Sequence, residues 1–338
     1  MSQTVATPPA HVERSESSAQ RTERIIELVQ RQGALAVLAL VIIVGVVSFD
    51  TFRTWGNAGT VLISAAPPAL IALGMTFVII SGGIDLSVGS LYVLGGVLSA
   101  WASQYGTWAA FALPLLVCGV FGLAQGLIIA YARLAPFIVT LAGLLGARGL
   151  MLALSDEGGT TYLVKTASFK HFGTGELFGI GYPVYLVLVL FAAGMLLLYR
   201  SRFGQSVYAI GGSEDAARLM GVRIRSTQVR VYVLSGMLAG LAGAINAARL
   251  GSGVTVLGTG MELDAIAAVV IGGTLLTGGA GTLGGTIAGV LLLQVIQNLI
   301  NQIGTVTSNW QTVISGAFIA VVVVAQTYLA RLRRVSSG

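Results

Sequence analysis

The chain has very little charge, and two long stretches have almost none. Only 9% of its 338 residues are charged, whereas 55% are hydrophobic. Residues 265–330 contain no Asp, Glu, Lys or Arg, and residues 54–132 contain a single charged side chain, that of Asp85. A water-soluble domain needs a charged surface, so these stretches exclude a soluble enzyme and belong in a bilayer. The mean hydropathy of +0.87 agrees, and transport is the function that such composition favours.

Lysine and cysteine are also scarce, and each scarcity excludes a kind of site. The only lysines, Lys165 and Lys170, follow Val164 and Phe169. A phosphate-binding loop needs Gly-Lys followed by Ser or Thr, so this chain is not expected to hydrolyse ATP through such a loop. A single cysteine, Cys118, excludes a disulfide framework. The net charge of +6 does not indicate nucleic acid, because most arginines flank apolar runs and the positive-inside rule accounts for them.

Apolar runs of membrane-spanning length predict an all-α polytopic membrane protein. A spanning helix needs about 20 mostly apolar residues, which leaves room for about ten helices with short connections. The expected membrane domain covers residues 34–330, between a polar N-terminal segment at 1–33 and a tail at 331–338. The expected spans lie at 34–49, 60–80, 84–102, 108–131, 136–153, 182–199, 228–248, 262–280, 283–303 and 308–329.

The basic residues predict which side of the membrane each connection faces. An even number of spans places both termini on one side, which then carries 14 of the 19 basic residues. The opposite side carries Arg53, Lys165 and Lys170. Cytoplasmic connections are enriched in Lys and Arg, so both termini and the connection at 200–227 are expected in the cytoplasm. The 14 residues are Arg14, Arg21, Arg24, Arg31, Arg133, Arg200, Arg202, Arg218, Arg223, Arg225, Arg230, Arg331, Arg333 and Arg334.

Glycines spaced four residues apart predict where the helices pack. Gly236 and Gly240 form one such pair, and Gly281, Gly285 and Gly289 form a longer series. In lipid no hydrophobic force drives one helix against another, and small residues let two backbones approach closely. These glycines are therefore expected to form helix-packing faces.

Asp85 and Ser87 lie between two apolar stretches. An ionised Asp at membrane depth costs at least ~2.5–3.5 kcal/mol on insertion scales. Asp85 could cap a helix over Leu86–Trp101, contact a transported solute, or couple transport to protons. Pro67 and Pro68 interrupt the preceding span, and broken helices are tolerated in a membrane where they face protein or water. This hairpin is therefore expected near a pathway.

The connection at 200–227 has the pattern of a short capped helix. Ser213 can cap it, acidic residues favour its first turn, and Gly221 can end it. Such a helix on the cytoplasmic face would serve as a docking element for another protein, whereas a helix lying flat on the membrane is the alternative. The candidate docking residues are Ser213, Glu214, Asp215, Ala216, Ala217, Arg218, Leu219 and Gly221.

Several motifs, in order along the chain, resemble those of ribose-type permease subunits of ABC sugar importers. The segment Gly82–Gly89 looks like the signature of that family, and Tyr208–Gly212 with Ala216–Gly221 resembles its coupling loop. The other matching motifs are Pro136–Leu141, Ala147–Gly149, Phe203-Gly204, Ile271–Thr274, Gly278–Gly281 and Gly285-Thr286. The family commonly has Asn at the position of Ser213, which can also cap a helix.

The resemblance implies the transmembrane fold of the vitamin-B12 importer in a bacterial cytoplasmic (inner) membrane. It implies a cytoplasmic ATPase that binds ATP and Mg²⁺, an extracytoplasmic sugar-binding protein, and a second permease subunit, either the same chain or a paralogue. No cofactor or metal is expected on this chain. A permease for branched-chain amino acids and an ion-coupled carrier remain alternatives, and the sugar stays open. The residues expected to border the pathway or its gate are Asp85, Ser87, Pro136, Phe137 and Thr140.

Overall fold

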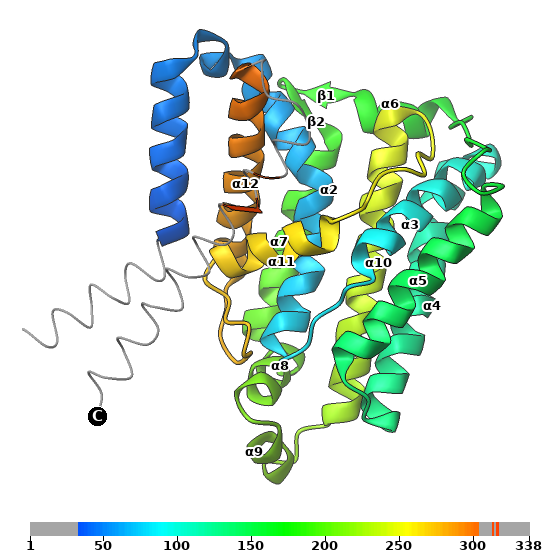
Figure 1. Cartoon of the computed structure of the whole chain (residues 1–338), viewed down its shortest axis with the longest axis vertical. Coiled ribbons are helices and arrows are strands. Elements are labelled where there is room, and N and C mark those ends of the chain that lie inside the picture. Colours follow the sequence, from blue (N-terminus) through cyan, green and yellow to red (C-terminus); the bar gives the residue numbers. More distant parts are fainter. Residues whose placement is uncertain (1–32, 304–312, 314–315, 318–338) are drawn as a thin grey trace, which may run out of the picture.

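A computed structural model of the chain describes residues 33–303, 313 and 316–317, and its long elements are all helices (Figure 1). Six of them are long and apolar enough to cross a membrane. They are α2 (Trp55–Ile80), α4 (Thr107–Ala132), α5 (Pro136–Leu154), α7 (Tyr182–Arg200), α10 (Ile224–Leu250) and α12 (Leu283–Ile303). The predicted all-helical, multi-pass membrane architecture is confirmed.

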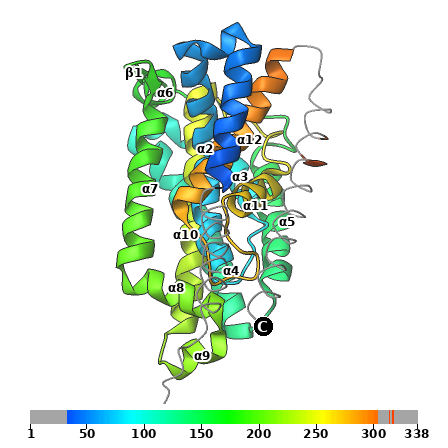
Figure 2. The same cartoon turned by 90° about the vertical axis from the view of Figure 1, so that its left-hand side faces the viewer.

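Shorter elements connect these helices and mark the two ends of the molecule. Figures 1 and 2 place β1, β2 and α6 at one end, here the upper end, and α8 and α9 at the opposite, lower end. The shorter helices are Gly33–Ser48, η1 (Asp50–Arg53), α3 (Val88–Ala102), η2 (Ser103–Tyr105), α6 (Ala167–Thr174), α8 (Arg202–Gly212), α9 (Glu214–Leu219) and α11 (Met261–Ile271). Strands β1 (Glu176–Leu177) and β2 (Ile180–Gly181) pair antiparallel.

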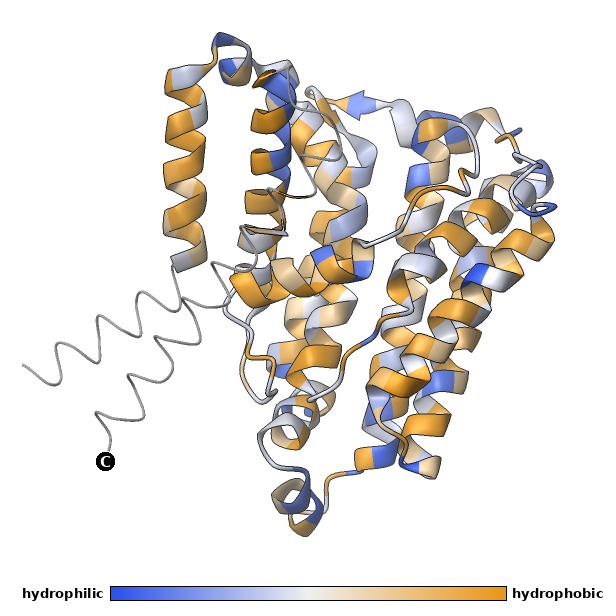
Figure 3. Cartoon of the chain, in the orientation of Figure 1, coloured by the Kyte–Doolittle hydropathy of each residue, from blue (hydrophilic) through white to orange (hydrophobic). Residues whose placement is uncertain are grey.

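The core of the bundle is formed by α2 and α10. Helix α10 packs against α4, α3 and α2, and α2 also contacts α7, α11 and α12. In their most apolar stretches, 83% of α2 and 78% of α10 is buried, compared with only 22% of α5 and 33% of α7. Figure 3 shows hydrophobic residues along these outer helices. Helices α5 and α7 therefore present apolar surface at the outside of this chain, while α2 and α10 form its interior.

Glycines bring two pairs of helices into backbone contact. A Cβ atom added to Gly240 of α10 would lie 2.6 Å from the Pro114 carbonyl oxygen of α4, and one on Gly236 would collide with the Cys118 carbonyl. Helix α12 meets α11 in the same way. There, Cβ atoms on Gly285 and Gly289 would collide with the carbonyls of Gly272 and Ala268. Gly281 precedes α12, and its Cβ would lie 2.6 Å from the Thr274 side chain.

Two predicted spans are wrong, because the helices there are too short. The expected span at 84–102 is represented by α3, with 15 residues, and the expected span at 262–280 by α11, with 11. A spanning helix needs about 20 residues. Left-handed glycines stop α11 and keep the chain irregular before α12: the φ angles of Gly273, Gly278 and Gly279 are 90°, 84° and 76°. Figure 1 shows α11 lying across the neighbouring helices. The predicted span at 308–329 falls outside the continuously described residues.

The close approach of α10 and α4 predicts a difference between two glycine substitutions. Gly236→Ala places a methyl group against backbone atoms that cannot rotate away, and overpacking of this kind costs ~1–3 kcal/mol. Gly149→Ala, in α5, meets nothing within 4 Å and gains helix propensity. Thermal unfolding of the purified protein in detergent should therefore show a lower Tm for Gly236→Ala only. Equal Tm values for the two variants would contradict the packing described here.

Candidate functional site

Asp85 lies in the connection between α2 and α3, and no part of it is exposed. Its Oδ1 atom accepts hydrogen bonds from the Ser87 backbone N–H at 3.0 Å and from the Ser87 hydroxyl at 2.6 Å. Its Oδ2 atom accepts a third from the Ser235 hydroxyl of α10 at 2.7 Å. Burying a carboxylate is costly unless hydrogen bonds satisfy it. The three bonds therefore fasten the break between α2 and α3 to the middle of α10.

The start of α3 differs from the predicted cap. The helix begins at Val88, and Ser87 occupies its N-cap position without a capping bond from its own side chain. Asp85 binds the N–H of Ser87, two residues ahead, which is the geometry of an Asx turn. The carboxylate satisfies a free amide as expected, but this amide precedes the helix.

Three further polar side chains that the sequence analysis missed lie around this carboxylate. Ser235 binds it directly, and Gln125 of α4 approaches Ser87, whose hydroxyl oxygen lies 3.3 Å from the Gln125 amide. A hydroxyl has one proton, and the Ser87 hydroxyl donates it to Asp85 at 2.6 Å, with the Gln125 Oε1 atom as a more distant acceptor at 3.3 Å. Within the described residues, Gln125 Nε2 and the Tyr232 hydroxyl are buried without a partner. In the sequence, Ser235, Gln125 and Tyr232 are marked only as single polar residues within apolar spans.

Of the predicted pathway residues in α5, only some lie close to this cluster. The Thr140 hydroxyl lies 3.2 Å from the Ile84 carbonyl and 2.9 Å from the Pro136 carbonyl, and Thr140 is buried. Pro136 begins α5 and lines the neighbouring cavity. Phe137 is 54% exposed and does not line that cavity. The structure thus gathers Asp85, Ser87 and Thr140, with Pro136 at the edge and Phe137 outside.

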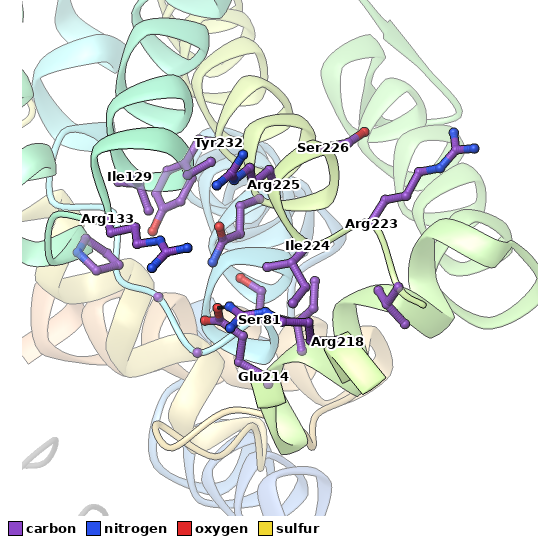
Figure 4. Close-up of a pocket in the computed structure, with 18 of the residues that line it drawn as sticks. Ser81, Ile129, Arg133, Glu214, Arg218, Arg223, Ile224, Arg225, Ser226 and Tyr232 are labelled. Carbon is purple, nitrogen blue, oxygen red and sulfur yellow. Dashed lines mark hydrogen bonds and ion pairs between the residues drawn. The ribbon is translucent and has the colours of Figure 1, made fainter. Parts of the chain in front are cut away.

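A cavity of about 960 Å³ opens below this cluster toward the lower end (Figure 4). Its walls come from the end of α2, the turn between α4 and α5, the junction of α8 with α9, and the start of α10. Gly83 and Tyr232 form part of the lining, and a Cβ on Gly83 would collide with the Tyr232 hydroxyl. The cavity therefore ends close to the segment that carries Asp85.

The charge around this cavity is mostly positive. Its lining includes Arg133, Arg218, Arg223 and Arg225 against one acidic residue, Glu214. Arg218 forms an ion pair with Glu214 at 2.7 Å. Figure 4 shows Arg223 pointing away from the other arginines. Arg225 lies 5.2 Å from the centre of the Tyr131 ring, within the range of a cation–π contact.

The connection at 200–227 contains α8 in addition to the predicted short helix α9. Ser201 caps α8 by accepting a hydrogen bond from the Gly204 N–H at 3.1 Å. Ser213 caps α9 as predicted, through the Ala216 N–H at 3.3 Å. Gly221 has a φ of 77°, and its N–H donates to the Arg218 carbonyl. Together with the bond from Val222 to the Ala217 carbonyl, this is the Schellman ending that favours glycine.

Helix α8 contacts two non-helical segments of the membrane domain, namely the turn that follows α2 and the loop that precedes α12. The Tyr208 hydroxyl donates to the Gly281 carbonyl at 2.7 Å. Burial, with an added contribution from Tyr199, raises the pKa of Tyr208 to about 12, so the hydroxyl keeps the proton that it donates. A Cβ on Gly211 would collide with the Ile80 carbonyl, which accepts a bond from the Gly279 N–H at 2.9 Å. One helix at the lower end therefore contacts the end of α2 and the loop before α12.

One of the predicted docking residues of α9, Ala217, faces the interior of the protein. Ala217 is fully buried and packs with Ile210 of α8 and Ile224 of α10. It is therefore not available to a partner in this structure. Leu219 is 91% exposed and Met220 is 70% exposed. The apolar surface that α9 offers is centred on these two residues.

Comparison with known proteins gives a family match over most of the chain. A family described as "Branched-chain amino acid transport system / permease component" matches residues 57–323. The ribose import permease protein of Escherichia coli strain K12 is 38% identical over 300 residues, covering 88% of this chain and 93% of that protein. The ribose import permease protein of Bacillus subtilis strain 168 is 40% identical, covering 86% and 90%.

A further relative has a different substrate in its name. The fructose import permease protein of Bifidobacterium longum is 34% identical over 312 residues, covering 89% of this chain and 91% of that protein. No solved structure matches the chain. The motif resemblance to sugar-importer permeases is confirmed by these relatives, and the chain belongs to the permease family that matches residues 57–323.

Proposed function

We propose that this chain is the transmembrane permease subunit of an ABC importer that moves a monosaccharide into the cytoplasm. The observation that carries the proposal is similarity at 34–40% identity over nearly the full length of permeases named for ribose and fructose import. The chain acts as a transport subunit rather than an enzyme. This sequence has no Gly-Lys pair for a phosphate-binding loop. ATP and Mg²⁺ are therefore bound by a separate ATPase subunit.

The orientation of the molecule follows from its charges. Arg133, Arg218, Arg223 and Arg225 lie around the lower cavity, whereas Lys170 lies on α6, at the upper end. Under the positive-inside rule, the lower end faces the cytoplasm and the upper end receives sugar from an extracytoplasmic binding protein. The membrane is then the bacterial cytoplasmic membrane, crossed an even number of times, with both termini inside. A second permease subunit, identical or paralogous, completes the pathway.

Helix α9 is the coupling element in this proposal. Its cap, its Schellman ending and the buried Ala217 hold it rigidly on α8 and α10. Leu219 and Met220 give it an exposed apolar surface for a groove on the ATPase. Motion of the ATPase would pass through α8 to the Ile80 carbonyl and the loop before α12.

Two alternative functions, a permease for branched-chain amino acids and an ion-coupled carrier, are less well supported. Branched-chain amino acids appear in the description of the family, but the three relatives described above are named for ribose or fructose import. An ion-coupled carrier would need a relay of ionisable groups in the membrane, and Asp85 is held by three hydrogen bonds from serine residues. Monosaccharide import driven by ATP is therefore the stronger proposal.

Uptake into proteoliposomes tests this function. The chain, its ATPase and its binding protein should accumulate a labelled pentose or hexose only when ATP is present on the ATPase side. Asp85→Asn replaces one acceptor oxygen with a donor, and losing a hydrogen bond to a charged group costs ~1.5–3 kcal/mol. If that cost falls on the transport barrier, uptake should fall roughly tenfold or more, while Cys118→Ala should transport normally. Normal uptake by both variants at equal expression would remove Asp85 from the pathway, and accumulation without ATP would contradict the function.

Association with the ATPase tests the role of α9. Leu219→Asp places a charge on the exposed surface of α9 without disturbing the buried Ala217. The ATPase should no longer copurify with this variant, although the permease still inserts in the membrane and folds. Leu163→Asp is the matched control, because Leu163 is 65% exposed and belongs to the connection at 154–181 on the opposite side. A Leu219→Asp complex that stays intact and hydrolyses ATP normally would exclude α9 as the docking site.

A further inference from the structure

A second cavity, of about 260 Å³, lies inside the helix bundle in its upper half. Its walls come from α2, α3, α10, α11 and α12. Ser64 lies nine residues below the start of α2, and Arg249 is the second-last residue of α10, which rises to the upper end. This volume of about 260 Å³ is just below the ~300–1,000 Å³ range of small-molecule sites, so the cavity suits a compact ligand.

The lining of this cavity is unusually polar for the interior of a membrane domain. It combines one cation and one anion, Arg249 and Asp264, with three carboxamides, a phenol and a hydroxyl. The uncharged polar members are Asn246, Gln294, Gln297, Tyr92 and Ser64. The formal charges cancel, and nearly every lining polar group can donate or accept several hydrogen bonds. This chemistry fits a neutral ligand with many hydroxyl groups.

The lining residues leave most of this hydrogen-bonding capacity unused among themselves. Arg249 donates to the Ser64 hydroxyl at 3.3 Å, and Gln294 donates to Gln297 at 3.4 Å. Among the described residues, Arg249 and Asp264 form no ion pair with each other or with any other side chain. Both observed bonds are long for their type. A fixed structural network would be expected to saturate its donors and acceptors.

The prolines of α2 free a backbone acceptor at a residue that lines the cavity. Pro67 and Pro68 both line it, and a proline has no N–H to give to the carbonyl four residues earlier. Pro68 therefore leaves the Ser64 carbonyl without its helical donor. On the opposite side, Figure 3 shows hydrophilic residues gathered along one side of α12, the helix that carries Gln294 and Gln297. Two helices thus turn polar groups toward the same space.

Placing these groups in a bilayer is costly, which argues that they serve transport. Ionisable side chains at membrane depth are expensive and face a wet cavity or a functional partner. Asp85 meets this requirement through serine residues of the protein itself, and its donors are identified. Arg249 and Asp264 instead face open space between five helices. Water and a hydroxylated solute are the partners that fit this arrangement.

We propose that this upper cavity is a binding site for a monosaccharide within the permease itself. The inference rests on the proposed function and adds to it a place where this chain contacts the sugar. Asp264 accepts hydrogen bonds from sugar hydroxyls, Arg249 donates to ring or hydroxyl oxygens, and Asn246 and Gln297 do both. The site makes the permease a second determinant of sugar selectivity after the binding protein.

Transport by the assembled complex tests this site with matched substitutions on one helix. Gln297→Ala removes a lining carboxamide, whereas Gln302→Ala removes the same side chain five residues along α12, outside the cavity. Proteoliposomes containing the chain, its ATPase and its binding protein are assayed with labelled ribose, arabinose, xylose and galactose. Uptake by Gln297→Ala and by Asn246→Ala should fall about tenfold, as expected for lost hydrogen bonds, while the binding protein still stimulates ATP hydrolysis.

The ratio between sugars separates a binding role from a structural one. D-Ribose and D-arabinose differ in the orientation of one hydroxyl, so removal of a side chain that contacts it should change the ratio of their uptake rates. Damage to folding would lower both rates equally. Wild-type rates and ratios in Gln297→Ala and Asn246→Ala, or the same loss in Gln302→Ala, would overturn the site. If the wild-type complex imports none of the four sugars, the proposed function fails first and the site falls with it.

Discussion

A bilayer offers no water to a buried polar group, so each such group must find its partner inside the protein. This constraint explains the arrangement around Asp85, the one charge in residues 54–132. Its carboxylate is satisfied by Ser87 and Ser235, and the bonds join the break after α2 to α10, the most central neighbour of α2. The same constraint makes the upper cavity conspicuous, because Arg249 and Asp264 have no ion pair among the described residues. The carboxylate of Asp85 is therefore satisfied within the protein, whereas the polar groups of the upper cavity are left to bind the solute that we propose there.

The broken helices supply a physical link between the lower end and the interior. The turn after α2 and the loop before α12 meet where the Gly279 N–H donates to the Ile80 carbonyl. Helix α8 contacts both through Gly211 and Tyr208. Helix α9 packs on α8 through Ala217. A displacement of α9 would therefore be transmitted through α8 to the turn after α2 and to the loop before α12.

Much of this architecture could be predicted from the sequence, because lipid constrains composition so strongly. The start expected for α12, at residue 283, is the one observed, and the predicted cap of α9 at Ser213 is also found. The lengths of α3 and α11 could not be predicted, because glycine pairs occur both inside spans and at their ends. The convergence of Gln125 and Ser235 on Ser87 and Asp85 depends on tertiary packing, as does the inward face of Ala217. A hydropathy profile does not reveal such contacts, because each involves a single polar or small residue whose neighbours in the sequence give no sign of its tertiary partners.

The proposed import, with an ATPase docked on α9 and sugar entering at the upper end, requires one orientation of the molecule in the membrane. Single cysteines at the two exposed positions Lys170 and Leu219, in a Cys118→Ala background, measure that orientation directly. A membrane-impermeant thiol reagent applied to the outside of intact cells should label Lys170→Cys. It should label Leu219→Cys only after the membrane is opened. Labelling of Leu219→Cys from outside, or of Lys170→Cys only from the cytoplasm, would contradict the orientation on which the transport cycle depends.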